Sequence, residues 1–410
     1  MLEELSSPAL WQAFYRYKSS RGLLTKREEQ ALTSYIAEGR YRAVAQRLAE
    51  GGNPFGHPTR RSIAKQGTAR KRIVYTYAED ENWALKMVAY LLHQYDGLFC
   101  DNCYAFRQGT GARNAFLRFA RTDLSNQWCF KADISDYFNS LDVDILCRLI
   151  QQALGEEDLC ALLCELLRDP WVCRAGQLVK EQKGCMAGTP IAPFCANLYL
   201  REMDAWFERR GALYARYSDD VVFFGSEREI AIYREAFEGF LEKYRLRVNP
   251  EKVGLYAPGE PWSFLGFSSH RGVIDIAPAT VKKLLARIRR AARSLYRWRL
   301  REGVAAEKAL QVMNRKFNRK FYAPQGGREL TWARWYFPIL NTDDSLRVIE
   351  RALQQYLRYL VTGRHNRANP ARAPYDMLKA CGYRPLVPAY YAYRREGLEA
   401  IYTPHSQDDC

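Results

Sequence analysis

Histidine is scarce in this chain, and long apolar runs are missing. The 410 residues contain five histidines, and Cys100 and Cys103 form its only Cys-x-x-Cys pair, so a structural zinc site would lack a second pair of ligands. No eighteen consecutive apolar residues occur, and the N-terminus carries early acids rather than a basic segment followed by an apolar one. We therefore expect no structural zinc, no membrane partner and a cytoplasmic protein.

Acidic residues are also in the minority. The chain has 62 Lys and Arg against 46 Asp and Glu, a net charge of +16 and a pI near 9.3. Such an excess favours a polyanionic partner, either nucleic acid or acidic lipid. Its length and its 48% hydrophobic content allow one large enzyme of several subdomains, or two to three ordinary domains. Several of the eleven cysteines lie in apolar runs, which indicates buried thiols in a reducing compartment.

Two adjacent carboxylates lie at a predicted hairpin turn. Residues 212–225, ALYARYSDDVVFFG, contain two β-prone runs that meet at Ser218, Asp219 and Asp220. Carboxylates at such a turn repel each other, and a divalent cation is the usual remedy. Ser-Asp-Asp is also ordinary turn chemistry, so this segment alone does not decide between a metal site and a solvated turn.

A third acid favours the metal site. Asp133 ends an apolar run in residues 128–141, WCFKADISDYFNSL, which predicts a second strand with a carboxylate at its end. Two such strands could hold two Mg²⁺ ions roughly 3.5–4 Å apart, the arrangement that serves phosphoryl transfer. Mg²⁺ takes oxygen ligands and completes its shell with phosphate. Between the acids, residues 184–200 form a Gly/Pro loop whose bare backbone could lie against a substrate or template.

In this order and at these distances, the three segments resemble the palm motifs of reverse transcriptases. The likeness extends from about residue 65 to residue 267. One departure is Ala187, where the family usually has Gln. The matching positions are Asp133 for the first metal-binding aspartate, Gly188, Pro190, Pro193 and Asn197 for the Gly-x-Pro-x-x-Pro loop and helix, and Tyr217, Ser218, Asp219 and Asp220 for the Tyr-x-Asp-Asp box.

The resemblance implies an α+β fold of the right-hand polymerase type, with helical fingers, a palm built on an antiparallel sheet, and a helical thumb. We expect an N-terminal helical extension over 1–60, fingers over 61–130, the palm over 131–275, a basic thumb over 276–345 and a C-terminal extension over 346–410. We expect the charged faces of the N-terminal extension to be solvated rather than to dock RNA.

The resemblance also implies a set of site residues. Two Mg²⁺ ions, which Mn²⁺ could replace, would be held by Asp133, Asp219, Asp220 and the backbone carbonyl of Ile134. Phe138 would lie under the sugar and exclude a 2′-hydroxyl, and Lys252 would give a proton to pyrophosphate. Core packing for Phe138 and a solvated side chain for Lys252 remain open alternatives. The predicted nucleotide-binding residues are Lys71, Arg72, Phe138, Gly188, Tyr217 and Lys252, and the predicted template contacts are Arg107 and Pro190.

Residues 281–320 carry most of the excess charge. They contain 14 Lys and Arg against Glu302 and Glu307, with apolar residues interleaved at helical spacing. This pattern predicts helices with one apolar and one basic face, including Arg289, Arg293 and Arg297. Such faces also bind membranes or proteins, but their position directly after a palm favours duplex backbone.

The implied function is synthesis of DNA from dNTPs on an RNA template, with an RNA–DNA duplex as product. The chain is most similar to stand-alone reverse transcriptases that act in phage defence with a structured non-coding RNA. A group II intron or retron-type enzyme is the near alternative, and no Cys/His cluster of an intron-type endonuclease follows the thumb. Template-independent, protein-primed synthesis and an inactive RNA-binding scaffold are further alternatives.

Overall fold

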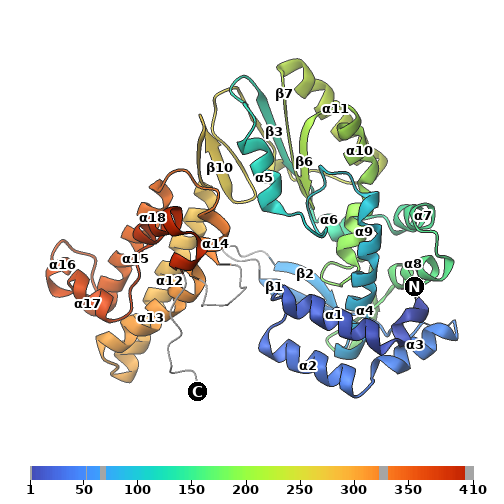
Figure 1. Ribbon diagram of the computed structural model, residues 1–410, viewed down its shortest axis with the longest axis horizontal. Coiled ribbons are helices and arrows are strands. Elements are labelled where there is room, and N and C mark those ends of the chain that lie inside the picture. The colour runs from blue at the N-terminus through green and yellow to red at the C-terminus, as the bar shows by residue number, and fades with distance from the viewer. Residues whose placement is uncertain (1, 52, 65–70, 323–330, 402–410) are drawn as a thin grey trace. The chain divides into compact units, whose positions relative to one another are not determined.

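The computed structural model describes residues 2–51, 53–64, 71–322 and 331–401, and it divides into two compact units (Figure 1). The first unit ends at Glu260 and the second begins at Pro261. Helices and mainly antiparallel sheets make up both units, which confirms the α+β class. No helix in the described ranges has the length and apolar character needed to cross a membrane.

The N-terminal segment is helical, as its sequence predicts. Thr25 and Glu28 form a reciprocal capping box at the start of the second α-helix, in which each side chain accepts from the other residue's backbone amide. Trp11 stacks on Tyr41 and meets Tyr35 edge-on, so these short helices share one aromatic core. The elements are η1 (Leu2–Ser6), α1 (Pro8–Ser20), α2 (Lys26–Ala37) and α3 (Tyr41–Ala49).

The central sheet of the first unit has four antiparallel strands in the order β6-β7-β3-β8. Its strands are β3 (Trp128–Asp133), β6 (Leu213–Tyr217), β7 (Asp220–Gly225) and β8 (Gly254–Tyr256). The expected hairpin is confirmed, because β6 and β7 pair over their length and the pair Tyr217–Asp220 closes a two-residue turn.

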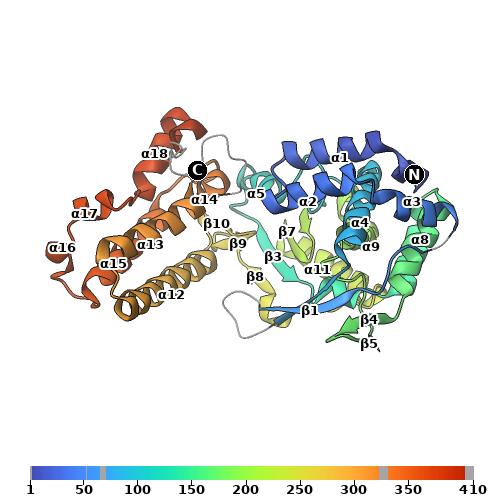
Figure 2. The same cartoon turned by 90° about the horizontal axis from the view of Figure 1, so that it is seen from below.

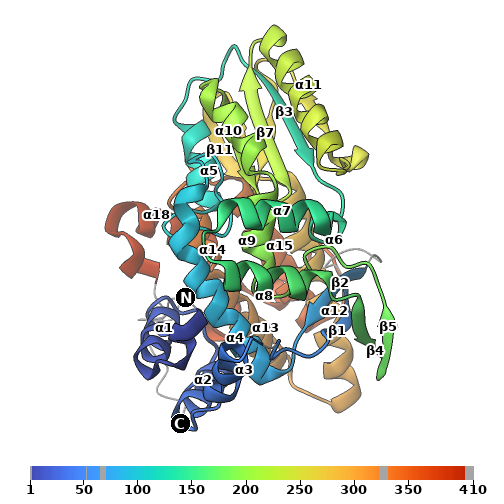
Figure 3. The same ribbon diagram turned by 90° about the vertical axis from the view of Figure 1, so that its right-hand side faces the viewer.

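Both faces of this sheet are covered by helices. Phe223 of β7 stacks on Phe130 and packs against Phe207 of α10 (Arg201–Arg209), next to α11 (Glu227–Lys243) (Figure 3). Phe224, which points to the other face, meets Phe119 of α5 (Ala112–Ala120). The continuous apolar run of β7 thus follows from burial on both sides.

A second sheet lies in the region where we expected helical fingers, so that region is not helical alone. Its strands are β1 (Thr59–Ala64), β2 (Lys71–Thr76), β4 (Trp171–Arg174) and β5 (Gln177–Lys180), in the order β2-β1-β4-β5 (Figure 2 and Figure 3). The hairpin β4–β5 lies far along the chain and joins β1 in parallel at the pair Thr59–Cys173. Local sequence patterns do not reveal such a long-range partner.

The other helices of the first unit carry most of its buried thiols. Cys147, Cys160, Cys164 and Cys195 are buried, as the apolar runs around them predict. Of the ten cysteines that the structure describes, all are free, and Cys100 and Cys173 alone are partly exposed. These helices are α4 (Glu79–Leu91), η2 (Leu92–Leu98), α6 (Tyr137–Ser140), α7 (Val143–Ala153), α8 (Glu157–Arg168), α9 (Ala192–Tyr199) and η3 (Pro250–Lys252).

The second unit confirms the predicted helices of residues 281–320. Long helices α12 (Pro278–Glu302) and α13 (Ala306–Phe321) pack with α15 (Asp344–Thr362), and α12 buries Leu284, Ile288 and Ala292. A small antiparallel sheet, which we did not predict, precedes them. The remaining elements are β9 (Trp262–Phe264), β10 (Phe267–His270), β11 (Val273–Ile276), α14 (Trp332–Tyr336), α16 (Asn369–Arg372), α17 (Tyr375–Ala380), α18 (Leu386–Glu396) and η4 (Leu398–Ile401).

Candidate active site

The three predicted aspartates meet at one end of the central sheet. Asp133 ends β3 and is the cross-strand neighbour of Asp220, the first residue of β7. Asp219 lies in the turn before β7, where its carbonyl oxygen accepts a hydrogen bond from the Ile134 amide at 3.0 Å. Strand register and this hydrogen bond therefore bring together carboxylates that are distant in sequence.

Burial makes ionisation of the Asp219 and Asp220 carboxyl groups unfavourable. Burial and then repulsion from Asp133 raise the pKa of Asp219. Burial raises the pKa of Asp220 to about 6, with Asp219 and Asp133 adding to the rise and Lys131 opposing it. A bound cation would relieve this cost, and carboxylate oxygens are the ligands that Mg²⁺ prefers.

The donor chemistry therefore fits Mg²⁺, although the side chains are not gathered around one point. Within the described residues, no three or more His, Cys, Asp or Glu side chains are grouped so that they could hold a metal ion. Asp133 is buried, and its carboxylate is instead paired with the ammonium of Lys252.

Lys252 is brought to Asp133 by the segment after α11. The Asn249 amide donates to the Asp133 carbonyl at 2.7 Å, and the Asn249 side chain accepts from the Glu251 amide at 3.2 Å. Lys252 ends η3, and its side chain is 44% exposed. Lys252 is therefore both ion-paired and solvent-exposed, and its proton-donor role remains a prediction.

Side-chain contacts connect three of the predicted nucleotide-binding residues, Arg72, Phe138 and Tyr217. Phe138 is half-buried, and the Arg72 guanidinium carbon lies 5.9 Å from its ring centroid. Phe106 lies between Phe138 and Tyr217, with centroid distances of 6.0 and 6.3 Å. Lys71 is exposed at the start of β2.

Phe106 was not among the predicted nucleotide-binding residues. It is 39% exposed and has a φ of +60°, which a bulky residue rarely adopts. The sequence predicts a template contact for the neighbouring Arg107, but neither the exposure nor the backbone angle of Phe106 can be read from the sequence. An exposed ring between two predicted site residues is a candidate contact for a nucleotide or a base.

The predicted template contacts share a cavity. Arg107, Gly188 and Pro190 line a space of about 580 Å³, together with Tyr17 and Lys18 of α1. The N-terminal extension therefore contributes to this wall, whereas we expected only solvated faces. The Arg107 guanidinium also braces its own loop by donating to the carbonyl oxygens of Cys100 and Cys103 at 2.6 and 3.0 Å.

Unpaired polar atoms line the same cavity. Asn197 is 1% exposed, yet its Oδ1 accepts no hydrogen bond in the part of the chain that the structure describes. The hydroxyl of Thr76 and the Nε of Arg107 are buried without partners in the same way. Buried polar groups are normally satisfied, so these atoms suit a polar ligand or ordered water.

Gly188 has a packing role that we did not predict. Its φ is +99°, and a Cβ there would lie 3.1 Å from Val74 Cβ and 3.2 Å from the Tyr75 carbonyl oxygen. The Tyr75 amide donates to the Ala187 carbonyl at 2.8 Å. The bare backbone expected to face a substrate thus lies against β2 at this point, because only glycine permits that approach.

A buried ion pair beneath the acidic turn was also missed. Arg216 of β6 is fully buried and donates from Nε and Nη2 to the carboxylate of Asp204 at 2.9 and 2.5 Å. Tyr214 donates to the same carboxylate at 2.7 Å, and Arg216 Nη1 donates to the Ser218 carbonyl at 3.2 Å. Arg216 therefore positions the turn that precedes Asp219.

The predicted basic face is present in the second unit. Arg289, Arg293 and Arg297 are four residues apart on α12, and all three are exposed. Residues at this spacing lie on one side of a helix, so the three guanidinium groups present a continuous stripe of charge.

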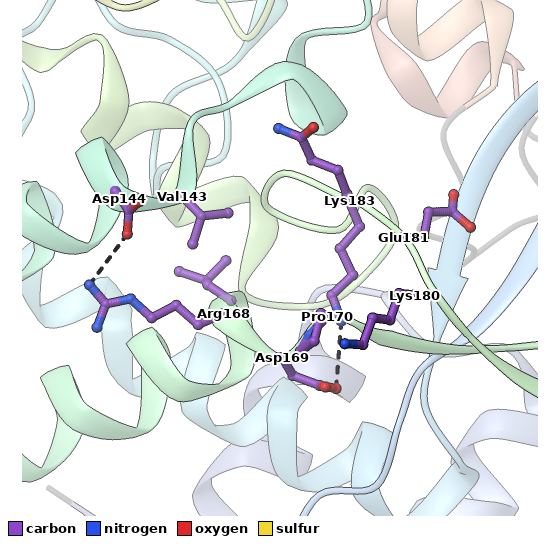
Figure 4. A pocket seen from close by; sticks show the side chains of 10 residues that line it. Val143, Asp144, Arg168, Asp169, Pro170, Lys180, Glu181 and Lys183 are labelled. Carbon is purple, nitrogen blue, oxygen red and sulfur yellow. Dashed lines mark ion pairs between the residues drawn. The ribbon is translucent and has the colours of Figure 1, made fainter.

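A further cavity of about 460 Å³ contains none of the predicted site residues (Figure 4). Lys183 lines it with a side chain that is 2% exposed, and its ammonium lies 3.6 Å from Asp169 and donates to the Trp171 carbonyl at 3.1 Å. Burial lowers the pKa of Lys183, while Asp169 opposes this. Asp169 also contacts His57 at 2.9 Å, so this group ties β4 to the N-terminal segment.

An antiparallel sheet with Asp133, Asp219 and Asp220 at one end is the arrangement expected of a polymerase palm. Residues 63–269, just over half of the chain, match the family described as reverse transcriptase (RNA-dependent DNA polymerase). The chain belongs to this family, which confirms the predicted right-hand polymerase class.

Individual relatives share only low sequence identity with this chain. The group II intron-encoded protein LtrA of Lactococcus lactis subsp. cremoris, also from strain MG1363, is 24% identical over 194 residues. The alignment covers 47% of this chain and 32% of LtrA, so the chain matches about a third of that protein. The structure of an apo telomerase from Candida tropicalis, truncated from its C-terminal domain, gives a TM-score of 0.43 at 15% identity, covering 55% of this chain and 56% of the other.

Proposed function

We propose that the chain synthesises DNA from dNTPs on an RNA template. The observation that carries this proposal is the register of β3 and β7, which sets Asp133 beside Asp220 and ties Asp219 to Ile134. Membership of the reverse transcriptase family gives this cluster its reaction class. Two divalent ions, when bound, would supply the positive charge that stabilises the attacking and leaving oxygens of phosphoryl transfer.

Each residue near the cluster then has a defined task. Asp133, Asp219, Asp220 and the Ile134 carbonyl hold Mg²⁺ or Mn²⁺. Lys71 and Arg72 of β2 face the incoming nucleotide and offset triphosphate charge, and Gly188 supports that strand from behind. Phe138 and Tyr217 pack against its sugar and base, and Phe106 supports both rings. Lys252 holds a proton close to Asp133 and gives it to pyrophosphate.

The nucleic acid follows two surfaces, one in each unit. An unpaired template base enters the cavity of Arg107 and Pro190, where the orphaned atoms of Thr76 and Asn197 can hydrogen-bond to it. The exposed stripe on α12 takes the RNA–DNA duplex by its phosphates.

For the biological setting, we propose a cytoplasmic enzyme that works with a structured non-coding RNA in phage defence. The support is the resemblance to stand-alone enzymes of that kind. A group II intron or retron-type role is compatible with the similarity to LtrA. Sequencing the nucleic acid that co-purifies with the chain tests this: a single host-encoded RNA supports defence, and intron RNA refutes it.

The activity is tested with Asp219→Ala/Asp220→Ala, scored by incorporation of labelled dNTPs on an RNA template with a DNA primer. We expect no product, with RNA binding retained, because the carboxylates serve the metal and the basic surfaces serve the backbone. Glu235→Ala/Glu242→Ala is the matched control, since it removes two exposed carboxylates from α11 of the same unit.

Undiminished synthesis by the aspartate variant would refute the palm assignment. Product that forms without template, or that stays covalently attached to protein, would favour protein-primed synthesis. A wild-type chain that binds RNA but never incorporates nucleotide would be the scaffold.

A further inference from the structure

The C-terminal end of α15 carries a stack of exposed and half-buried aromatic rings. The imidazole of His365 lies flat on Tyr359, with centroids 4.9 Å apart and planes 10° apart. Tyr356 meets His365 edge-on at 5.1 Å, and Tyr296 of α12 packs against Tyr359 at 5.0 Å. His365 is exposed although one of its faces rests on Tyr359, so its other side is open to solvent.

Several contacts restrain the loop that carries His365. Gly363 ends α15 with a φ of +70°, and a Cβ there would overlap the Tyr296 hydroxyl. The Arg364 carbonyl accepts from the Asn369 side-chain amide at 2.6 Å and from the Thr362 hydroxyl at 3.1 Å. A ring fixed in this way loses little entropy when a second ring stacks on it.

The helix end itself is tied to α12. Arg299 donates through one Nη to the carbonyl oxygens of Leu360 and Val361, at 2.6 and 2.9 Å. These two acceptors belong to the last turn of α15, whose carbonyls have no partner within the helix. The platform therefore rests on two packed helices rather than on the loop alone.

Positive charge surrounds these rings without local neutralisation. Residues 351–375 contain five arginines and no aspartate or glutamate. Arg364, Arg367 and Arg372 are exposed, and none of them has a carboxylate within ion-pair distance in the described part of the chain. Arg364 directly precedes His365 in sequence, and Arg367 follows it two residues later.

We propose that this aromatic–arginine patch (Tyr296, Tyr356, Tyr359, Arg364, His365 and Arg367) binds an unpaired nucleotide. The base stacks on the open face of His365, and Arg364 and Arg367 take the neighbouring phosphates. A free base offers a flat face to an aromatic ring, whereas bases within a duplex are already stacked on each other. The inference rests on the proposed function for its choice of partner, and it adds a single-strand site to the duplex stripe on α12.

The test is fluorescence anisotropy with the full-length chain, in the absence of metal and dNTPs. The probes are a labelled RNA strand of about 12 nucleotides, a DNA strand of the same sequence, and the corresponding blunt RNA duplex. His365→Ala is expected to weaken single-strand binding by about 5- to 150-fold, the range for loss of one stacked base, and duplex binding by less than about twofold. His365→Phe restores the affinity because it keeps a flat ring.

A charge control separates the arginines from general basicity. Arg364→Gln/Arg367→Gln should weaken single-strand binding and lower its salt dependence, whereas Arg394→Gln/Arg395→Gln, which removes two exposed arginines from α18, should change neither. If His365→Ala weakens binding of the RNA strand alone, the site is specific for RNA. If it weakens binding of the RNA and DNA strands equally, the site accepts both kinds of single strand. Either result supports the proposal.

Three results would overturn it: His365→Ala that binds single strands like the wild type, single-strand and duplex affinities that fall together, or no rescue by His365→Phe. Failure of the proposed function would be seen in the incorporation assay and not here, because this binding assay involves no DNA synthesis. A chain that binds through His365 but makes no DNA would refute polymerase activity and leave this site intact.

Discussion

Removing the charge of Asp204 is expected to release the turn that carries Asp219 and Asp220. In Asp204→Asn the buried guanidinium of Arg216 loses its counter-ion while keeping most of its packing. Breaking a buried ion pair from one side typically costs about 3–5 kcal/mol. Because Asn retains an oxygen that can accept from Arg216 and Tyr214, we expect a value near the lower end, roughly 3 kcal/mol.

A second variant, Arg216→Met, and the double variant together give the interaction energy between Asp204 and Arg216. Arg216→Met leaves Asp204 as the uncompensated charge and also removes the donors to the carbonyls of Ser218 and Asn197. The double variant has no buried charge, but it keeps those two carbonyls unpaired, at about 1–3 kcal/mol each. It should therefore be less destabilised than the sum of the single variants by at least about 2 kcal/mol.

The measurement is hydrogen exchange of the β6–β7 peptides, read as a local opening free energy. A local probe is needed because a chain of two compact units need not unfold in one step. Arg209→Met, an exposed arginine on the same helix as Asp204, is the control. Unchanged hydrogen-exchange protection in Asp204→Asn would show that the ion pair does not stabilise the turn. The same conclusion would follow if the free-energy changes of the two single variants simply added in the double variant.

Three other predictions follow from the site and the thumb. Phe138→Ala should raise the incorporation of ribonucleotides relative to deoxynucleotides in a direct competition; an unchanged ratio, with a stability loss of up to about 3–5 kcal/mol, would mean that the ring only packs. Replacing Arg289, Arg293 and Arg297 with Gln should flatten the slope of log affinity against log salt by roughly 0.7–0.9 per lost phosphate contact, and an identical slope would move the duplex elsewhere. Gly188→Ala should lower the melting temperature and the activity together, since its Cβ would press on β2; a variant as stable as the wild type would contradict the packing described for this glycine.

Sequence patterns predicted what depends on neighbouring residues. The capping box of Thr25 and Glu28 and the hairpin that ends in Asp219 each need only a few adjacent side chains. The pairing of Asp133 with Asp220 could be anticipated because the resemblance supplied the long-range contact. Without such help, the pairing of β1 with β4 could not be predicted, since these strands are distant in sequence and meet only in the folded chain.

The missed site features have a common physical cause. Arg216 lies in a strand with an ordinary alternation of residues, and only the folded chain buries it beside Asp204. Phe106 is a candidate site residue because of its positive φ and its contacts with the rings of Phe138 and Tyr217. Burial of charge and backbone strain depend on tertiary neighbours, so a single sequence carries no local sign of either.

The burial of the thiols makes this chain suited to site-specific labelling. Burial raises the pKa of Cys100 to about 12, so its thiolate is scarce at neutral pH, and eight other described cysteines are enclosed in the fold. With Cys410, which lies outside the described residues, replaced by serine, a maleimide dye should attach chiefly to Cys173. That residue sits on β4 where the strand meets β1, so a single fluorophore there would report on the fingers sheet as template and nucleotide bind.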